Sequence, residues 1–176
     1  MASDQKQILL RRIRLWVVVF IAGLIVSGVT AIPLEWELNL AARVLVNSDA
    51  AKAESGLVKW VTRVQQGLRE TYGKYPFVAY GTDWLAFGHF AIAICFIGAY
   101  RDPVRNAWLF TFGMIACWLV IPFALIFGGL RGIPFFWRLI DCSFGLFGLV
   151  PLYFCKRFLS QLAGLVDGQK AVQTDR

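Results

Sequence analysis

Residues 107–127 read AWLFTFGMIACWLVIPFALIF, a stretch without a single charged side chain. A helix needs about 20 consecutive, mostly apolar residues to cross the hydrocarbon core of a bilayer. This stretch is long enough and apolar enough to do so. It therefore predicts that the chain is an integral membrane protein.

Three further apolar runs accompany this stretch along the chain. They cover residues 15–32, about 84–100 and 135–155. Short polar or glycine-rich turns join the last three runs, as expected for neighbouring antiparallel helices. We predict an all-α protein, an integral membrane four-helix bundle in which residues 82–157 form transmembrane helices 2–4.

The composition agrees with a membrane protein. Apolar residues make up 58% of the chain and charged residues 16%, whereas soluble domains carry about 25% charged residues. The formal net charge is +7, but the basic residues stand beside the apolar runs and do not form one stripe. Basic charge placed there is a topology signal. We therefore expect membrane lipids as partners and no nucleic acid.

The basic residues of the short segments also predict the orientation. Cytoplasmic flanks of transmembrane helices are enriched in Lys and Arg. The N-terminal segment 1–14, the turn at 101–106 and the tail 158–176 with its preceding Lys156-Arg157 hold most of the basic charge outside the long segment 33–81. We predict a multi-pass protein of the bacterial inner membrane with both termini in the cytoplasm and residues 33–81 outside.

The first apolar run, residues 15–32, has a second interpretation. It follows a basic segment, and Val29-Thr30-Ala31 resembles the small-residue site at which a signal peptide is cleaved. The run is longer than the usual core of a signal peptide, which favours an uncleaved membrane anchor. Cleavage would leave three transmembrane helices.

The long segment 33–81 contains two helical patterns. Apolar residues recur every three or four positions over 34–46 and again over 57–72, and Asn47-Ser48-Asp49 predicts a turn between them. Each pattern places the apolar residues on one face of a helix. We predict an external amphipathic helical segment that rests on the bilayer surface or on the mouth of the bundle.

Two ionisable residues stand inside the fourth apolar run. Arg138 and Asp141 are three residues apart on one helix, so they share a face, which continues through Gly145 and Gly148. Asp141 lies about 9 Å into the span at 1.5 Å per residue. Such residues are costly in a membrane and are usually paired or functional. An intrahelical ion pair, a substrate-facing pair and a snorkelling arginine with a buried aspartate all remain open.

The sequence contains one histidine, His89, in the second span at a depth similar to that of Asp141. It is either a hydrogen-bonded core residue or a general base. Asp83 and Arg131 fall at the same membrane boundary, so we expect them to bind a ligand together with Arg138. With His89 and Asp141 they would form one polar mouth that suits an anionic lipid head group.

No cofactor or metal is predicted from the sequence. A lone histidine supplies neither a bis-histidine haem site nor the several ligands that zinc requires. The four cysteines lie in or beside apolar runs without a Cys-x-x-Cys pair, which favours packing roles.

Several of these residues resemble the motifs of VanZ-like membrane proteins. The resemblance rests on Ser27 before Pro33, on Asp83 before His89-Phe90, and on Arg131, then Asp141, Gly145 and Gly148. It covers about three-quarters of the chain and implies an envelope protein linked to glycopeptide resistance. The chain departs from the family in a longer Asp-to-His spacing, in lacking Glu-x-x-Gln in the third span, and in the 33–81 insertion.

Three functions are compatible with these features. The leading hypothesis is an accessory envelope protein whose polar mouth binds a lipid or a partner helix. The alternative is a membrane enzyme acting on a lipid-linked substrate, with His89 and Asp141 as base and orienting group and Arg138 or Arg131 on the phosphate. The third is a small transporter subunit, which would work as a homo-oligomer because four helices rarely enclose a pathway alone.

Overall fold

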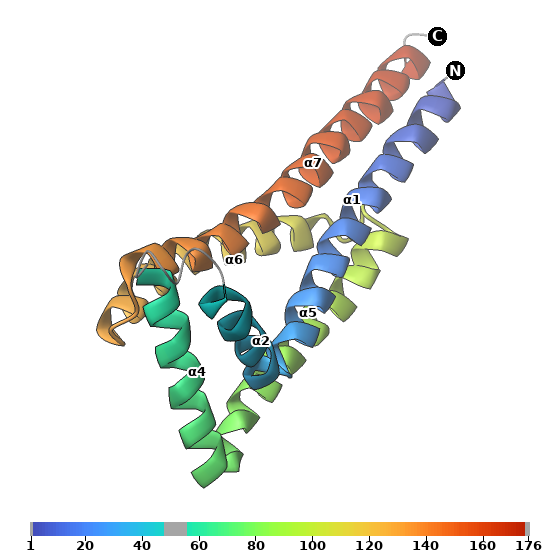
Figure 1. The fold of residues 1–176 in the computed structure, drawn as a ribbon. Helices are drawn as coiled ribbons and strands as arrows, with labels where there is room; N and C mark the ends of the chain where they lie inside the picture. The colour runs from blue at the N-terminus through green and yellow to red at the C-terminus, as the bar shows by residue number, and fades with distance from the viewer. Residues whose placement is uncertain (1, 48–55, 175–176) are drawn as a thin grey trace. The chain divides into compact units, whose positions relative to one another are not determined.

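The computed structural model describes residues 2–47 and 56–174, and over these residues it consists of helices connected by short turns (Figure 1). The helices are α1 (Ala2–Ala31), α2 (Leu34–Val46), α4 (Gly56–Lys74), the 3₁₀-helix η1 (Pro76–Ala79), α5 (Tyr80–Arg101), α6 (Ala107–Leu130) and α7 (Phe135–Thr174). No strand occurs in these two described ranges, and the predicted all-α class is confirmed.

Four helical segments are long and apolar enough to cross a membrane. They are Asp4–Ala31, Pro76–Arg101, Ala107–Leu130 and Phe135–Val166. The predicted number of candidate transmembrane helices is thus confirmed, and the chain has the features of a multi-pass membrane protein. Helices α1 and α7 extend well beyond the apolar runs at 15–32 and 135–155, because Lys, Arg and Gln are good helix formers.

The outer surfaces of these helices suit a lipid environment. On α6, Leu119, Phe123 and Ile126 expose most of their side chains although they follow one another at helical spacing. A helix that is apolar all round is typical of a membrane span. In water such a surface would be an aggregation liability.

The chain divides into two compact units. The first unit comprises Met1–Gly23 and Ala93–Arg176, and the second unit comprises Leu24–Ile92.

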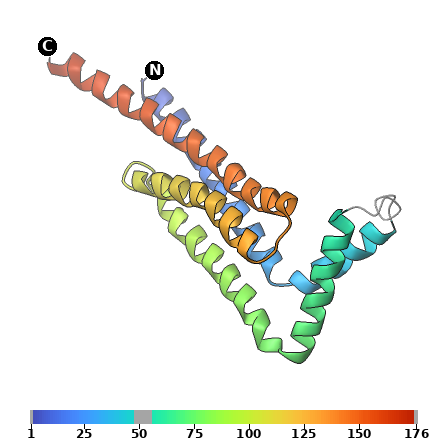
Figure 2. The same cartoon turned by 90° about the vertical axis from the view of Figure 1, so that its left-hand side faces the viewer.

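The core of the first unit is built from large apolar side chains of all its helices. Ile13 and Val17 of α1, Phe96 of α5, Phe110 of α6 and Leu152 of α7 are completely buried. Helices α6 and α7 form the main packed pair, and the N-terminal half of α7 lies beside α6 (Figure 2). This packing stabilises the unit, because the buried side chains make more dispersion contacts with one another than they would make with lipid tails.

Small residues allow α6 and α7 to approach each other closely. A Cβ atom built on Gly145 would collide with the backbone carbonyl of Cys117, and one on Gly148 would come within 2.7 Å of the Cys117 Sγ. The glycines that the sequence places on one face of α7 therefore lie against α6. Small residues at such contacts are the usual means by which membrane helices pack.

The turn at residues 101–106 is closed by side chains that cap α5. The Asn106 amide donates to the carbonyl oxygens of Gly98 and Asp102 at 3.1 and 2.9 Å, and the Arg14 Nε donates to that of Tyr100 at 3.2 Å. These bonds satisfy carbonyls that a helix end otherwise leaves without partners. The Arg14 charge also interacts favourably with the negative end of the helix dipole.

In the second unit, α2 and α4 pack against each other (Figure 1). Ala42 of α2 and Val61 of α4 are buried in the contact. The two helices coincide with the patterns predicted over 34–46 and 57–72. The apolar face of α4 thus has α2 as a protein partner. Of the predicted turn 47–49, only Asn47 lies within the described residues, where it follows the last residue of α2.

Candidate functional site

The five residues predicted to form a polar mouth are distributed over both units. Asp83 and His89 stand on α5 in the second unit, whereas Arg131, Arg138 and Asp141 stand at or beside the ends of α6 and α7 in the first.

Arg138 lies against the last two turns of α6. Its Nη1 donates to the Leu125 carbonyl oxygen at 3.2 Å, and its guanidinium lies 5.4 Å from the centre of the Phe135 ring. The aliphatic part fills the space left by Gly128, whose built Cβ would be 2.7 Å from the Arg138 Cγ. A cation near the C-terminal end of a helix is stabilised by the helix dipole. The contacts therefore give Arg138 a structural role.

Asp141 is half-buried on the next turn of α7. The contacts of Arg138 point toward α6, and among the described residues of this unit no salt bridge joins Arg138 to Asp141. A spacing of three residues brings two side chains to one face of a helix but does not determine where a long arginine ends. The intrahelical ion pair is thus not formed in this structure.

Arg131 and Asp83 are both exposed at helix ends. Arg131 follows the last residue of α6, and Gly132 after it adopts a φ of 71°, a conformation that favours glycine. Asp83 lies in the first turn of α5, where a carboxylate is stabilised by the positive end of the helix dipole. Both positions are thus compatible with ligand binding and equally with capping.

His89 forms a hydrogen-bonded pair with Ser27 of α1. The His89 Nε2 is 3.2 Å from the Ser27 Oγ, and the His89 Nδ1 is 2.8 Å from the Leu85 carbonyl oxygen. A carbonyl oxygen only accepts, so the neutral imidazole carries its proton on Nδ1. Its Nε2 is then an acceptor, and the Ser27 hydroxyl donates to it. We call these two residues the Ser27–His89 pair.

Gly28 explains how the two helices come close enough for this bond. A Cβ atom built on Gly28 would lie 2.6 Å from the Phe90 Cε1, so the ring occupies the space that any larger residue needs. The residues after Ser27 and His89 are therefore in direct contact. This contact keeps α1 and α5 together at the level of the hydrogen bond.

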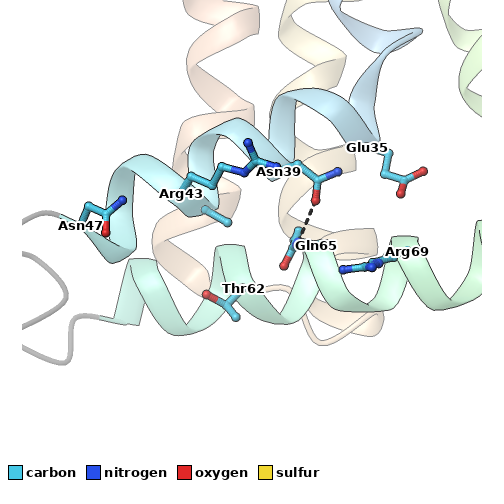
Figure 3. A pocket seen from close by; sticks show the side chains of 8 residues that line it. Glu35, Asn39, Arg43, Asn47, Thr62, Gln65 and Arg69 are labelled. Atoms are coloured by element: carbon cyan, nitrogen blue, oxygen red, sulfur yellow. Dashed lines mark hydrogen bonds between the residues drawn. The ribbon is translucent and has the colours of Figure 1, made fainter.

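The second unit also contains a polar pocket, the α2–α4 pocket, with a volume of about 630 Å³ (Figure 3). Its lining residues come from both helices: Glu35, Asn39, Ala42, Arg43 and Asn47 from the α2 side, and Thr62, Gln65 and Arg69 from α4. Two guanidinium groups, three amides and a hydroxyl provide many donors, against a single carboxylate. Its volume is within the usual range for small-molecule sites.

One hydrogen bond connects the two walls of the α2–α4 pocket. The Gln65 Nε2 donates to the Asn39 Oδ1 at 2.7 Å, as the dashed line in Figure 3 marks. Asn39 lies between Glu35 and Arg43 on α2. The bond therefore joins the two walls near the middle of the pocket, and the charged side chains of Glu35 and Arg43 lie on either side of it.

Besides the face that lines the pocket, α2 has an apolar face that is exposed. Trp36, Leu40 and Val44 follow at intervals of four residues and are 65%, 49% and 62% exposed. Each of them directly follows a residue that lines the pocket. Helix α2 therefore presents a polar pocket and, next to it, an unburied apolar stripe.

Sequence reasoning did not identify the α2–α4 pocket or the partner of His89. The signal for the pocket was present, since Glu35, Asn39, Arg43 and Asn47 recur at intervals of four on one face of a helix. The partner of His89 is 62 residues away in the chain, and no local pattern connects it to Ser27. As to metals, the described residues contain no group of three or more His, Cys, Asp or Glu able to hold an ion.

Comparison of the chain with protein-family models, curated proteins and solved structures yields no match.

Proposed function

We propose that this chain is an accessory protein of the bacterial inner membrane that binds phospholipid head groups outside the membrane through the α2–α4 pocket. In this proposal the four candidate helices form the transmembrane bundle and both termini are cytoplasmic. The resemblance to VanZ-like proteins suits such an envelope role. The observation that carries the proposal is the pocket with two arginines beside an exposed apolar stripe.

The chemistry of the α2–α4 pocket supports a phosphate-containing ligand. Arg43 and Arg69 each present a planar fork of N–H donors, which matches phosphate oxygens, and Thr62 adds a hydroxyl. Glu35 opposes an additional negative charge at its end of the pocket. These donors favour an anionic head group with a phosphodiester, such as that of phosphatidylglycerol.

The apolar stripe supports the location of the pocket at the membrane surface. Helix α2 begins three residues after the end of the first candidate span at Ala31, so it starts near the membrane boundary. Trp36 heads the stripe, and tryptophan is enriched at membrane–water interfaces. An amphipathic helix in this position buries its apolar face among the acyl chains and keeps its polar face near the head groups.

Native mass spectrometry of the full-length protein tests the proposal. The delipidated protein in detergent is titrated with phosphatidylglycerol and, in parallel, with phosphatidylcholine. The variant Arg43→Gln/Arg69→Gln should bind phosphatidylglycerol at least about tenfold more weakly, since each basic residue near an anionic surface contributes about 1 kcal/mol. The neutralising Glu35→Gln should strengthen binding, because it removes the opposing carboxylate.

A matched variant separates the pocket from general surface charge. Arg63→Gln/Lys74→Gln removes the same charge from α4 at exposed positions outside the pocket. Specific binding predicts that this variant keeps nearly full affinity. Equal losses in the two double variants would mean that phosphatidylglycerol is held by net charge, and the proposed pocket function would be rejected.

The Ser27–His89 pair favours a second candidate function, a membrane enzyme acting on a lipid. A hydroxyl hydrogen-bonded to an oriented imidazole is the arrangement that activates a serine nucleophile. This candidate requires that Ser27 reacts with electrophiles.

A further inference from the structure

We propose that Ser27 is a nucleophile and His89 its general base, and that the pair cleaves or transfers the acyl ester of a membrane lipid. The identity of the substrate rests on the proposed head-group binding, whereas the reactivity of the pair does not. The inference adds a chemical step to a chain otherwise proposed to bind lipid.

The hydrogen bonds of the pair have the direction that nucleophile activation requires. The Ser27 hydroxyl donates to the His89 Nε2 at 3.2 Å, and the Nδ1–H donates to the Leu85 carbonyl oxygen at 2.8 Å. The carbonyl fixes the ring and its tautomer, as a third group does in serine hydrolases. It also stabilises the imidazolium that forms when His89 takes the proton.

The position of Ser27 along the chain indicates the kind of bond it would meet. Ser27 is four residues before the end of the first candidate span at Ala31, about 6 Å at 1.5 Å per residue. In this proposal the membrane boundary lies near Ala31, which places Ser27 at the level of the ester groups that join the head group of a glycerolipid to its acyl chains. Both side chains are half-buried, so neither is sealed off from such a substrate.

The proposed reaction has two steps. The Ser27 Oγ attacks the ester carbonyl carbon while the His89 Nε2 takes the hydroxyl proton. The bond from this carbon to the alkoxy oxygen then breaks, His89 returns the proton to that oxygen, and a lysolipid leaves acylated Ser27. Water or a second alcohol attacks the acyl group, His89 takes its proton, and this proton restores the Ser27 hydroxyl as the new acid or ester departs.

A fluorophosphonate probe tests the reactivity of Ser27 in the unmodified full-length protein. An activated serine forms a bond from its Oγ to phosphorus and releases fluoride, whereas an ordinary serine does not react. Incubation in nanodiscs followed by intact-mass and peptide mass spectrometry should show one adduct, located at Ser27. Ser143 is the internal control, because its hydroxyl lies in another span and donates to the Ile140 carbonyl without an imidazole.

Variants then connect the reactivity to His89. His89→Gln keeps a polar side chain at this position but supplies no base, so the labelling rate should fall at least about 100-fold. Ser27→Ala should abolish the adduct. In nanodiscs of ester-linked phosphatidylglycerol the unmodified protein should release lysolipid, and in nanodiscs of the ether-linked analogue it should not.

The outcomes distinguish this inference from the proposed function. An unlabelled Ser27, or labelling that His89→Gln leaves unchanged, would overturn the inference and leave the pair as a hydrogen bond that ties α1 to α5. The Arg43→Gln/Arg69→Gln variant should lose phosphatidylglycerol affinity yet retain fluorophosphonate labelling. Labelling with pocket-independent lipid binding would reject the proposed function and keep the reactive serine.

Discussion

Gly145 and Gly164 lie on the same helix, α7, yet a methyl group added at each meets different surroundings. At Gly145 it would collide with the Cys117 carbonyl, whereas nothing lies within 4 Å of the corresponding position at Gly164. Gly145→Ala should therefore lower stability by about 1–3 kcal/mol through overpacking. Gly164→Ala should be neutral or stabilising by up to about 1 kcal/mol, because alanine favours helix. Thermal unfolding in detergent measures both, and similar changes would contradict the close α6–α7 contact.

Arg138 and Asp141 differ in what their substitution should cost. Arg138→Met removes the charged hydrogen bond to the Leu125 carbonyl, worth about 1.5–3 kcal/mol, and the contact with Phe135. Asp141→Asn removes no partner of Arg138 and should cost less. The same thermal-unfolding measurement ranks the two variants. A larger loss in Asp141→Asn would show that the carboxylate carries an interaction that the geometry of Arg138 does not explain.

Some contacts of these residues could be predicted from the sequence, and others could not. The spacing of Arg138 and Asp141 correctly places them on one helix, but the flexible arginine side chain turns toward α6, which no spacing rule describes. The glycine face of α7 was predictable because its period is that of the helix itself. The contact between Ser27 and His89 was not, because it depends on how two separate helices meet.

At the scale of elements, the packing of α2 on α4 should depend on Val61. This side chain is only 4% exposed, so Val61→Asp would bury an isolated carboxylate unless the helices separate. We expect α4 to detach and limited proteolysis of the second unit to accelerate. The rate at which the intact chain disappears on a gel gives the measurement.

The control for this experiment is Gln66→Asp, which introduces the same charge at an exposed position of α4. Its cleavage rate should stay close to that of the unmodified protein. If both variants are cut equally fast, or neither is cut faster, α2 and α4 do not protect each other through Val61.

The elements were predicted unequally well. Apolar periodicity located α2 and α4 to within about two residues. It could do so because each of these helices has one face that packs against a protein partner and another face that is exposed. The N-terminal end of α1 and the C-terminal end of α7 lie more than ten residues beyond the apolar runs at 15–32 and 135–155. Hydropathy marks the part of a helix that suits the hydrocarbon core, whereas the helix itself continues as long as its backbone hydrogen bonds do.

At the scale of the whole molecule, the proposed crossing of the membrane by all four candidate spans would determine which side each connection faces. An even number of crossings places the two termini on one side. The proposed head-group pocket follows the first candidate span, and the turn at 101–106 follows the second. The number of spans was readable from the sequence, because apolar length is a local property. The distances between the five residues of the predicted polar mouth could not be read from the sequence, because they depend on how the two units are assembled.

Topology mapping tests whether all four helices cross the membrane. Paired periplasmic and cytoplasmic activity reporters are fused after Lys74, Asn106, Gly132 and Arg157 of the protein expressed in a bacterium. We expect external signals at Lys74 and Gly132 and cytoplasmic signals at Asn106 and Arg157. A cytoplasmic signal at Lys74 would contradict this expectation, because the first helix would then not cross and the α2–α4 pocket would lie on the wrong side of the membrane.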